Sequence, residues 1–278
     1  MPELPEVQAH AERLDRAFAG AVLEGFRPLA FHALKTFTPD PADAEGAALV
    51  YVGRRGKHLL LDFGVLTFVV HLMQGGRLRV DDKQAIKPRG GLARWRFRDG
   101  RALLLTEAGT EKKAGVWTVD GDPEEQPPLT GLGPDAETLD PDGLLEIAHA
   151  NPMRLHSFLR DQHALAGLGR RLANEICHRA RLSPFAPTSK LDTDEATALV
   201  EAIRTCIGEG LAFERGRDDM SSSADHPGNV HHRTGEACPV CGDIIRAVEY
   251  RSYTVNYCAT CQTGGKILAD NTTSKFLK

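Results

Sequence analysis

The sequence predicts an α+β fold. An N-terminal helix leads into an antiparallel β-sandwich, and a helical region then leads into a four-cysteine hairpin. Three patterns predict it: a helical apolar face near the start, strand-like alternation over residues 21–119, and helical periodicity over residues 142–212. Of the 278 residues, 41% are hydrophobic and 26% are charged. These values are typical of globular proteins and exclude a disordered or collagen-like chain.

Residues 5–19 are predicted to form the first helix. Pro5 suits a first helical turn, and Glu6 is favoured there because the amino end of a helix carries positive partial charge. Gly20 is the expected stop. The helix is expected to bury one apolar face, made of Val7, Ala11, Leu14 and Phe18.

Residues 21–119 are predicted to form strands. Arg94–Arg98 alternates with period two, and Asp99-Gly100 after it is a strong hairpin signal. An antiparallel sandwich is the expected arrangement. The segments with a strand pattern are Leu49–Val52, Lys57–Phe63, Val65–Leu72, Arg77–Val80, Arg94–Arg98, Leu103–Leu105 and Gly115–Val119.

The charge of the chain is unevenly distributed. The net charge is −4, but residues 120–146 hold nine acidic residues and no lysine or arginine, so the remainder carries +5. Residues 151–185 hold six arginines against two acidic residues. Such a local basic patch favours phosphate binding, and a solvated helix face is the alternative.

The acidic, Pro- and Gly-rich segment 120–141 is predicted to be an interdomain linker. It separates a sandwich domain over residues 1–119 from a helical domain over residues 142–229. The last part of that helical domain, residues 215–229, is expected to be a loop. A cysteine-bearing hairpin module is predicted over residues 230–278.

Cys238, Cys241, Cys258 and Cys261 form two CxxC pairs with 16 residues between them. Each pair can offer two thiolates to one metal ion, and the intervening residues are long enough for a hairpin. The spacing predicts a structural zinc site, with a rubredoxin-like iron site as the alternative. Four thiolates leave no open position for water, so a catalytic metal is not expected.

No stretch reaches the roughly 18 apolar residues of a membrane-spanning helix, and the start of the chain lacks the features of a secretory signal. We therefore expect a cytoplasmic protein with no membrane partner. Cysteines in that compartment are typically thiols or metal ligands. Cys177 and Cys206, which fall in helical patterns, are predicted to be buried thiols.

Met1-Pro2-Glu3 offers chemistry if Met1 is removed, as is usual before a small second residue. Pro2 would then carry a free secondary amine, which can attack an aldehyde-level carbon and form an iminium. Glu3 beside it could act as a general acid. On the residues alone, a plain lead-in to the first helix is the alternative.

Together, the start of the chain and its four-cysteine hairpin resemble the formamidopyrimidine-DNA glycosylase / endonuclease VIII family. The first motif is Met1–Val7. Further matches follow in the family's order, so the resemblance spans essentially the whole chain. They are Arg54–Leu61, His71–Arg79, Leu132–Asp135, Asp161-Gln162, Gly167–Gly169 with Glu175 and Pro184, and Val230–Glu236.

The resemblance implies a monomeric base-excision-repair enzyme that binds double-stranded DNA, removes oxidised bases and cuts the strand at the abasic site. Pro2 would attack the sugar C1′, Glu3 would protonate the ring oxygen, and Lys57 would act as a phosphate-side acid or charge stabiliser. The damaged nucleotide would be flipped out of the duplex. The helical region would hold a helix–two-turn–helix motif, and the cysteines one structural zinc ion. The protein would associate with the bacterial nucleoid when bound to DNA.

Positions that would wedge into DNA depart from the family pattern. The family's Arg/Phe wedge loop falls on residues 110–115, where Lys112 keeps only a charge and Ala114 cannot separate bases. Gln74 stands at the position of the family's intercalating Met, with Met73 one residue earlier. The wedge is therefore expected to be weaker or to come from other residues.

DNA phosphates are expected to be bound by Arg170, Arg233 and Arg251. Arg170 takes the place of the family's phosphate-binding Asn at a helix start. Arg233 lies in the segment that leads to the hairpin. The family's hairpin arginine falls on Tyr253, and period two would put Arg251 on the same strand face, so either residue could replace it.

A damaged-DNA-binding protein without catalysis is the alternative function, and a zinc-ribbon protein-interaction module is a weaker one. The presence of Pro2, Glu3 and Lys57 favours the enzyme. The preference for oxidised purines or oxidised pyrimidines stays open. Leu4 resembles the formamidopyrimidine branch, whereas His232-Arg233 resembles the endonuclease VIII branch.

Overall fold

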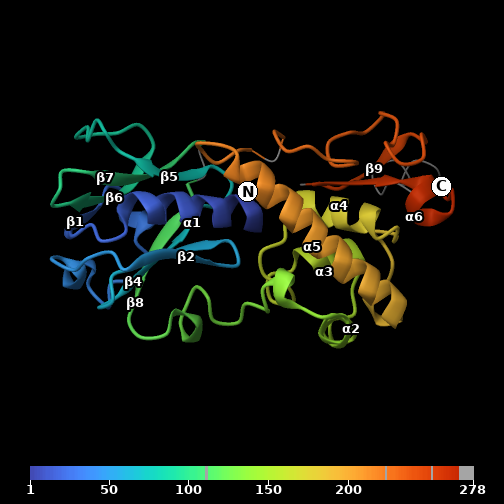
Figure 1. Ribbon diagram of the computed structural model, residues 1–278, viewed down its shortest axis with the longest axis horizontal. Helices are drawn as coiled ribbons and strands as arrows, with labels where there is room; N and C mark the ends of the chain where they lie inside the picture. Colours follow the sequence, from blue (N-terminus) through green and yellow to red (C-terminus); the bar gives the residue numbers. More distant parts are fainter. Residues whose placement is uncertain (110–111, 223, 252, 269–278) are drawn as a thin grey trace. The chain divides into compact units, whose positions relative to one another are not determined.

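The computed structural model describes residues 1–109, 112–222, 224–251 and 253–268 (Figure 1). The chain divides into two compact units. The first comprises Met1–Gly131 with Asp218–Met220, and the second comprises Leu132–Arg217 and the described residues from Ser221 onward. The separation of the second unit into a helical domain and a hairpin module at residue 230 stays a prediction.

The first unit begins with helix α1, Leu4–Phe18, which starts and ends one residue earlier than predicted. All four residues of its predicted apolar face are buried, and they pack into the core of the sandwich. Gly20 follows the helix with a φ of +81°. Glycine adopts this conformation without steric cost, which explains why the helix ends there.

Two four-stranded antiparallel sheets form the predicted sandwich (Figure 1). Their strand orders are β1-β6-β7-β5 and β2-β3-β4-β8. The rings of Phe68 and Trp95, one from each sheet, pack edge to face in the core with their centroids 5.7 Å apart. The strands are β1 (Leu23–Pro28), β2 (Tyr51–Arg55), β3 (His58–Asp62), β4 (Thr67–His71), β5 (Gly76–Val80), β6 (Gly91–Phe97), β7 (Ala102–Glu107) and β8 (Gly115–Val119).

Of the predicted strands, Gly115–Val119 alone has the observed bounds, and the others differ by one to three residues at one or both ends. The strand expected over Leu49–Val52 is β2, which lies further along the chain. The strand expected from Lys57 begins one residue later, because Gly56 and Lys57 form the turn between β2 and β3. Gly56 has a φ of +54°, which lets the chain reverse within two residues. Lys57 therefore lies at a hairpin tip rather than in a strand.

Four helices occupy the region of the second unit that was predicted to be helical. The longest packs against two of the others, and its start is capped by Asp192, which accepts the backbone N–H of Glu195 at 2.8 Å. None of the helices in the described part of the chain is long and apolar enough to cross a bilayer. They are α2 (Pro141–Ala150), α3 (Leu155–Arg160), α4 (Arg170–Arg179) and α5 (Thr193–Arg215).

Cys177 on α4 and Cys206 on α5 are buried, as predicted. Burial raises the pKa of Cys206 to about 11, and it raises the pKa of Cys177 as well. Both thiols are therefore protonated at neutral pH and serve as packing groups.

The hairpin predicted between the two cysteine pairs is formed by β9 (Ile245–Glu249) and β10 (Thr254–Cys258), and α6 (Ala259–Thr263) follows it. The expectation that Arg251 and Tyr253 share a strand face is wrong. Both residues lie in the connection between the strands, which the Tyr250 N–H closes by donating to the Tyr253 carbonyl at 2.9 Å. Their side chains are therefore not related by strand periodicity.

Candidate active site and metal centre

The amino terminus of the first unit is fixed by the start of α1. Pro2 is buried, and Glu3 is only 3% exposed. The Glu3 N–H donates to the Glu6 carboxylate at 2.8 Å, which satisfies a backbone donor that the helix leaves unpaired. The two proposed reactive residues are therefore held at a defined place rather than on a free tail.

The α-amino group, carried by Met1 in the encoded chain, has a lowered pKa. Burial is the largest cause, Glu3 opposes the shift, and the positive charges of Lys57 and Arg77 add to it. An amine in these surroundings is biased toward its neutral, nucleophilic form. Removal of Met1 would transfer the amine to Pro2.

Lys57 is 7% exposed at the turn between β2 and β3. The rings of the neighbouring His58 and His71 lie with their centroids 4.5 Å apart. Burial is the largest cause that lowers the pKa of His58 to about 3 and that of His71 to about 4, and the charge of Lys57 contributes to both shifts. Both rings are thus neutral at physiological pH and do not compete with the lysine for an anion.

The turn between β4 and β5 carries the predicted intercalating residues. Met73 is half-buried with a φ of +51°, and its N–H donates to the His71 ring nitrogen Nδ1 at 3.2 Å. Gly76 leaves room for this turn, since a Cβ there would lie 2.2 Å from the Leu72 carbonyl oxygen. The turn presents Gln74 as its exposed side chain.

The connection between β7 and β8 corresponds to the altered wedge loop. Thr110 and Glu111 lie outside the described residues. Lys112 is exposed, whereas Ala114 is buried and its N–H donates to the buried Glu107 carboxylate at 2.8 Å. Glu107 was not among the residues predicted from the sequence, although an acidic residue at the end of an apolar strand was an available signal.

The four hairpin cysteines converge at one point. All four sulfurs lie within 4.8 Å of one another, with Cys241 and Cys258 at 3.3 Å and Cys238 and Cys261 at 3.9 Å. A tetrahedral zinc ion with bonds of about 2.3 Å to sulfur would separate its ligands by about 3.8 Å. The donor set and the spacing therefore fit one such ion.

Two contacts that the sequence did not reveal support this cluster. The ring nitrogen Nε2 of His178, on α4, lies 3.3 Å from the Cys238 sulfur. The Asp243 carboxylate accepts from the Thr260 N–H at 3.2 Å and from its hydroxyl at 2.9 Å, which connects the two CxxC segments. Such surrounding hydrogen bonds orient metal ligands.

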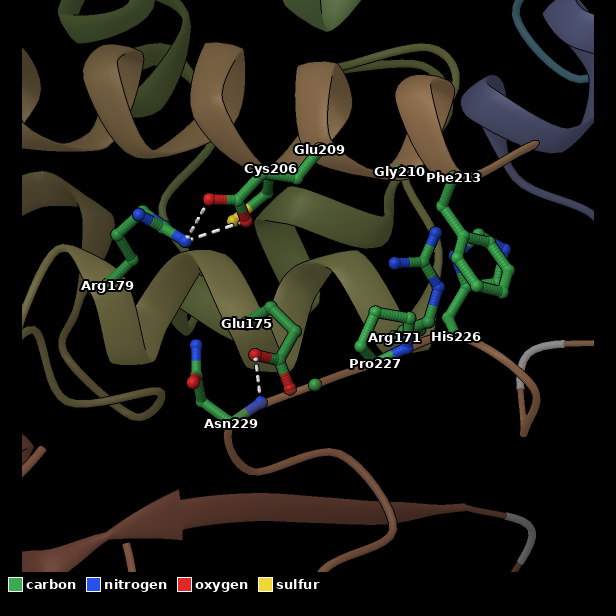
Figure 2. Close-up of a pocket in the computed structure, with 11 residues that line it drawn as sticks. Arg171, Glu175, Arg179, Cys206, Glu209, Gly210, Phe213, His226, Pro227 and Asn229 are labelled. Carbon is green, nitrogen blue, oxygen red and sulfur yellow. Dashed lines mark hydrogen bonds and ion pairs between the residues drawn. The ribbon is translucent and has the colours of Figure 1, made fainter. Parts of the chain in front are cut away.

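The arginine-rich segment contains both structural and exposed side chains. Arg179 donates to both carboxylate oxygens of Glu209 at 2.7 Å (Figure 2), and Arg171 is 4% exposed. Arg170, the first residue of α4, is exposed, and its guanidinium lies 5.8 Å from the centroid of the Tyr253 ring. The exposed basic patch is therefore smaller than the six arginines of residues 151–185 alone would indicate.

The other two arginines expected at phosphates have different surroundings. Arg233 donates to Glu236 at 2.8 Å and to the Gly228 carbonyl at 3.0 Å, so part of its hydrogen-bonding capacity is used within the chain. Arg251 is exposed in the connection between β9 and β10, where Tyr253 is half-buried.

Glu175 anchors the segment that leads to the hairpin, a role that was not predicted from the sequence. Its carboxylate accepts the backbone N–H groups of Asn229 at 2.8 Å, Val230 at 3.0 Å and His231 at 2.8 Å. Figure 2 shows the first of these bonds beside a cavity of about 340 Å³ that α4, α5 and residues 226–229 line. The glutamate thus joins the helical part of the second unit to the segment before the cysteines.

Comparison with known proteins identifies the family of the chain. Residues 1–110 match the family model for the formamidopyrimidine-DNA glycosylase N-terminal domain, and residues 130–222 match the model for the H2TH domain of the same enzymes. The formamidopyrimidine-DNA glycosylase of Methylococcus capsulatus is 31% identical over 277 residues, which cover 94% of this chain and all of that protein. The chain belongs to the formamidopyrimidine-DNA glycosylase family.

Two other similar proteins support membership of the formamidopyrimidine-DNA glycosylase family. An uncharacterised formamidopyrimidine-DNA glycosylase-like protein of Mycobacterium tuberculosis is 39% identical over 160 residues, which cover 55% of this chain and 98% of that protein. The crystal structure of the MutM (Fpg) protein from Thermus thermophilus superimposes with a TM-score of 0.80 at 28% identity, covering 96% of this chain and all of that one. The predicted fold class is confirmed.

Proposed function

We propose that the protein is a base-excision-repair DNA glycosylase that removes oxidised bases from double-stranded DNA and cuts the strand at the abasic site. The observation that carries the proposal is the buried pair of Pro2 and Glu3 at the start of α1. Burial lowers the pKa of the Met1 amine beside them, and the charge of Lys57 lowers it as well. Membership of the formamidopyrimidine-DNA glycosylase family supports the same reaction. We place the protein in the cytoplasm, where its proposed substrate lies, and we propose that it acts as a monomer.

In the proposed reaction, removal of Met1 leaves Pro2 with a secondary amine that attacks C1′ of the damaged nucleotide. The bond from C1′ to the base breaks, and the base leaves with the electron pair. Glu3 donates a proton to the ring oxygen, so the sugar opens and an iminium forms between the Pro2 nitrogen and C1′. The iminium acidifies C2′, which gives its proton to water, and the C3′–O bond breaks so that the 3′ phosphate leaves with the electron pair. Water then releases the sugar fragment and restores the amine.

Charged groups around this centre are proposed to bind the DNA backbone. Lys57, buried beside two neutral histidine rings, stabilises phosphate charge near the reacting sugar. Gln74, exposed at its turn, and the neighbouring Met73 occupy the space left by the flipped nucleotide. Further phosphate contacts are proposed for Lys112, Arg170, Arg233 and Arg251.

One zinc ion held by Cys238, Cys241, Cys258 and Cys261 is proposed to stabilise the hairpin. The four sulfurs lie close enough to share one ion, and four thiolates complete its coordination. Zinc bound there supplies folding energy and no reactive position. The proposed chemistry is therefore assigned to Pro2, Glu3 and Lys57 and not to the metal.

Borohydride trapping tests the mechanism. With protein whose Met1 has been removed and a duplex that carries an abasic site, borohydride should reduce the iminium and link the DNA to residue 2. A retained N-terminal tag blocks the amine and should abolish the link, whereas Pro2→Gly keeps an amine and should retain some cleavage. Duplexes with 8-oxoguanine or an oxidised pyrimidine identify the preferred base. A link that maps to Lys57 would contradict the mechanism.

A DNA-binding protein without base excision is the second candidate. The observation that favours it is the altered wedge, because Ala114 is buried and Gln74 is the exposed side chain of its turn. This candidate predicts tight binding to abasic DNA with no covalent link after borohydride treatment. The same trapping experiment therefore separates the two functions.

A further inference from the structure

Two arginines of the second unit lie over one aromatic ring. The guanidinium carbon of Arg160, the last residue of α3, is 4.3 Å from the centroid of the Tyr253 ring. The guanidinium carbon of Arg170, the first residue of α4, is 5.8 Å from the same centroid. Three segments distant in the sequence thus bring two positive charges to one ring.

The Tyr253 ring is held by other rings. Tyr250 stacks on it with a centroid distance of 4.6 Å and an interplanar angle of 9°, and His156 lies parallel to it at 6.1 Å. His156 is only 2% exposed, and burial, with the charges of Arg160 and Arg170, lowers its pKa to about 3. The histidine is therefore neutral and does not repel the two guanidinium groups.

The charges of Arg160 and Arg170 are available to a ligand. In the described part of the chain, neither forms a salt bridge with a carboxylate, whereas Arg179 and Arg233 are each paired with a glutamate. Arg170 is exposed and Arg160 is half-buried. A guanidinium over an aromatic face can still donate its in-plane N–H groups to a phosphate. Because the ring already restricts the side chain, less conformational entropy is lost when the phosphate binds.

We infer that Arg160 and Arg170, positioned by the ring of Tyr253, form a phosphate-binding site for the DNA backbone. The site adds Arg160 to the contacts of the proposed function, on which this inference rests. Tyr253 acts as a positioning residue, because its ring orders the arginines without adding charge. The start of α4 contributes the positive end of its dipole at the same place.

Salt-dependent binding of the full-length protein to a duplex with a non-cleavable abasic-site analogue tests the inference. Arg160→Ala should weaken binding about tenfold near 0.1 M salt and reduce the slope of log K against log salt by about 1, the value for one lost phosphate contact. The matched control is Arg204→Ala, which removes an exposed arginine from α5 and should change neither quantity.

The role of Tyr253 is tested by changing its ring while keeping both arginines. Tyr253→Phe should bind like wild type, whereas Tyr253→Leu should weaken binding several-fold. Arg160→Ala should then reduce DNA affinity by a smaller factor in the Tyr253→Leu protein than in the wild type, because the two side chains act together. Zinc content and melting temperature confirm that each variant is folded.

Several results would overturn the inference. One is an Arg160→Ala variant whose DNA affinity and salt slope equal those of a DNA-binding wild type. This result would leave the proposed function intact. Equal binding by Tyr253→Leu and Tyr253→Phe would remove the positioning role. Failure of the wild type to bind any abasic duplex would reject the proposed function and this site together.

Discussion

Glu3 is the side chain on which the proposed base excision depends most directly. It is nearly fully buried, its backbone N–H is bound by Glu6, and it follows the residue that would carry the nucleophilic amine. A carboxyl group held in this position is already oriented, so little conformational entropy is lost when it protonates the sugar. Substitution by an amide of the same shape removes the proton donor and leaves the packing unchanged.

Glu3→Gln is therefore expected to slow base release by at least about 100-fold, the lower range for loss of a general acid. Cleavage at a preformed abasic site should be partly retained, because that substrate has no base to lose. Single-turnover rates of base release and strand cleavage measure the two steps. Glu24→Gln, on the exposed side of β1, is the control and should affect neither step. Equal losses in both steps would contradict the assigned role.

At the scale of single elements, the turn between β4 and β5 is tightly constrained. It reverses the chain between Leu72 and Gly76, and the two backbones approach so closely that no side chain fits at Gly76. The same turn places Gln74 at the surface. Its shape and its proposed contact with DNA are thus coupled.

Gly76→Ala is expected to destabilise the first unit by about 1–3 kcal/mol, the typical cost of overpacking, and to weaken binding to abasic DNA. The matched control is Gly208→Ala in the interior of α5, where a Cβ meets no atom within 4 Å. That variant should stabilise the protein by about 0.5–1 kcal/mol, because alanine favours helix more than glycine does. Urea unfolding of both variants measures the effects, and unchanged stability of Gly76→Ala would show that the turn can relax.

The hairpin of β9 and β10 is expected to depend on its metal. Cys258→Ala removes one of four converging sulfurs, so it should abolish stoichiometric zinc and unfold the segment that carries Tyr253. Cys206→Ala is the control, since that thiol lies away from the cluster on α5 and should leave zinc at one ion per chain. Metal analysis with proteolysis of the hairpin tests this. Purified wild type without zinc would contradict the prediction.

For the whole molecule, buried histidines link stability to pH. Five histidines have a pKa lowered to about 3 or 4, and burial is the largest cause in each case. They are neutral in the folded protein, whereas each takes up a proton below about pH 6.5 when unfolded. They are His10, His58, His71, His156 and His231.

The free energy of unfolding should therefore fall as the pH is lowered from about 6.5 toward 4, because the unfolded state binds more protons in that range. Each histidine contributes up to about 1.4 kcal/mol per pH unit. Urea unfolding at pH 7 and pH 5 measures the loss, and His10→Gln should reduce its slope. Equal stability at the two pH values would show that these rings are protonated within the fold.

Local patterns in the chain were sufficient for several features. The face of Val7 and Leu14 on α1, the hairpin at Asp99-Gly100 and the pairing of CxxC segments were all predicted correctly. Each depends on residues a few positions apart, whose geometry follows from helix or strand periodicity or from ligand spacing. The Pro2 and Glu3 hypothesis required a resemblance as well, because a short terminal segment has no periodicity to interpret.

Other features arise only when distant segments meet. Arg160 comes to the ring of Tyr253 from 93 positions earlier in the chain, and His178 comes to Cys238 across 60 positions. No local pattern contains such pairs, because packing of the helices against the hairpin sets their distances. Even the place of Lys57 depended on pairing, since the register of β2 with β3 puts it in a turn. The amino-acid sequence determines which charged side chains are present, whereas the packing of neighbouring strands and helices determines where each of them lies.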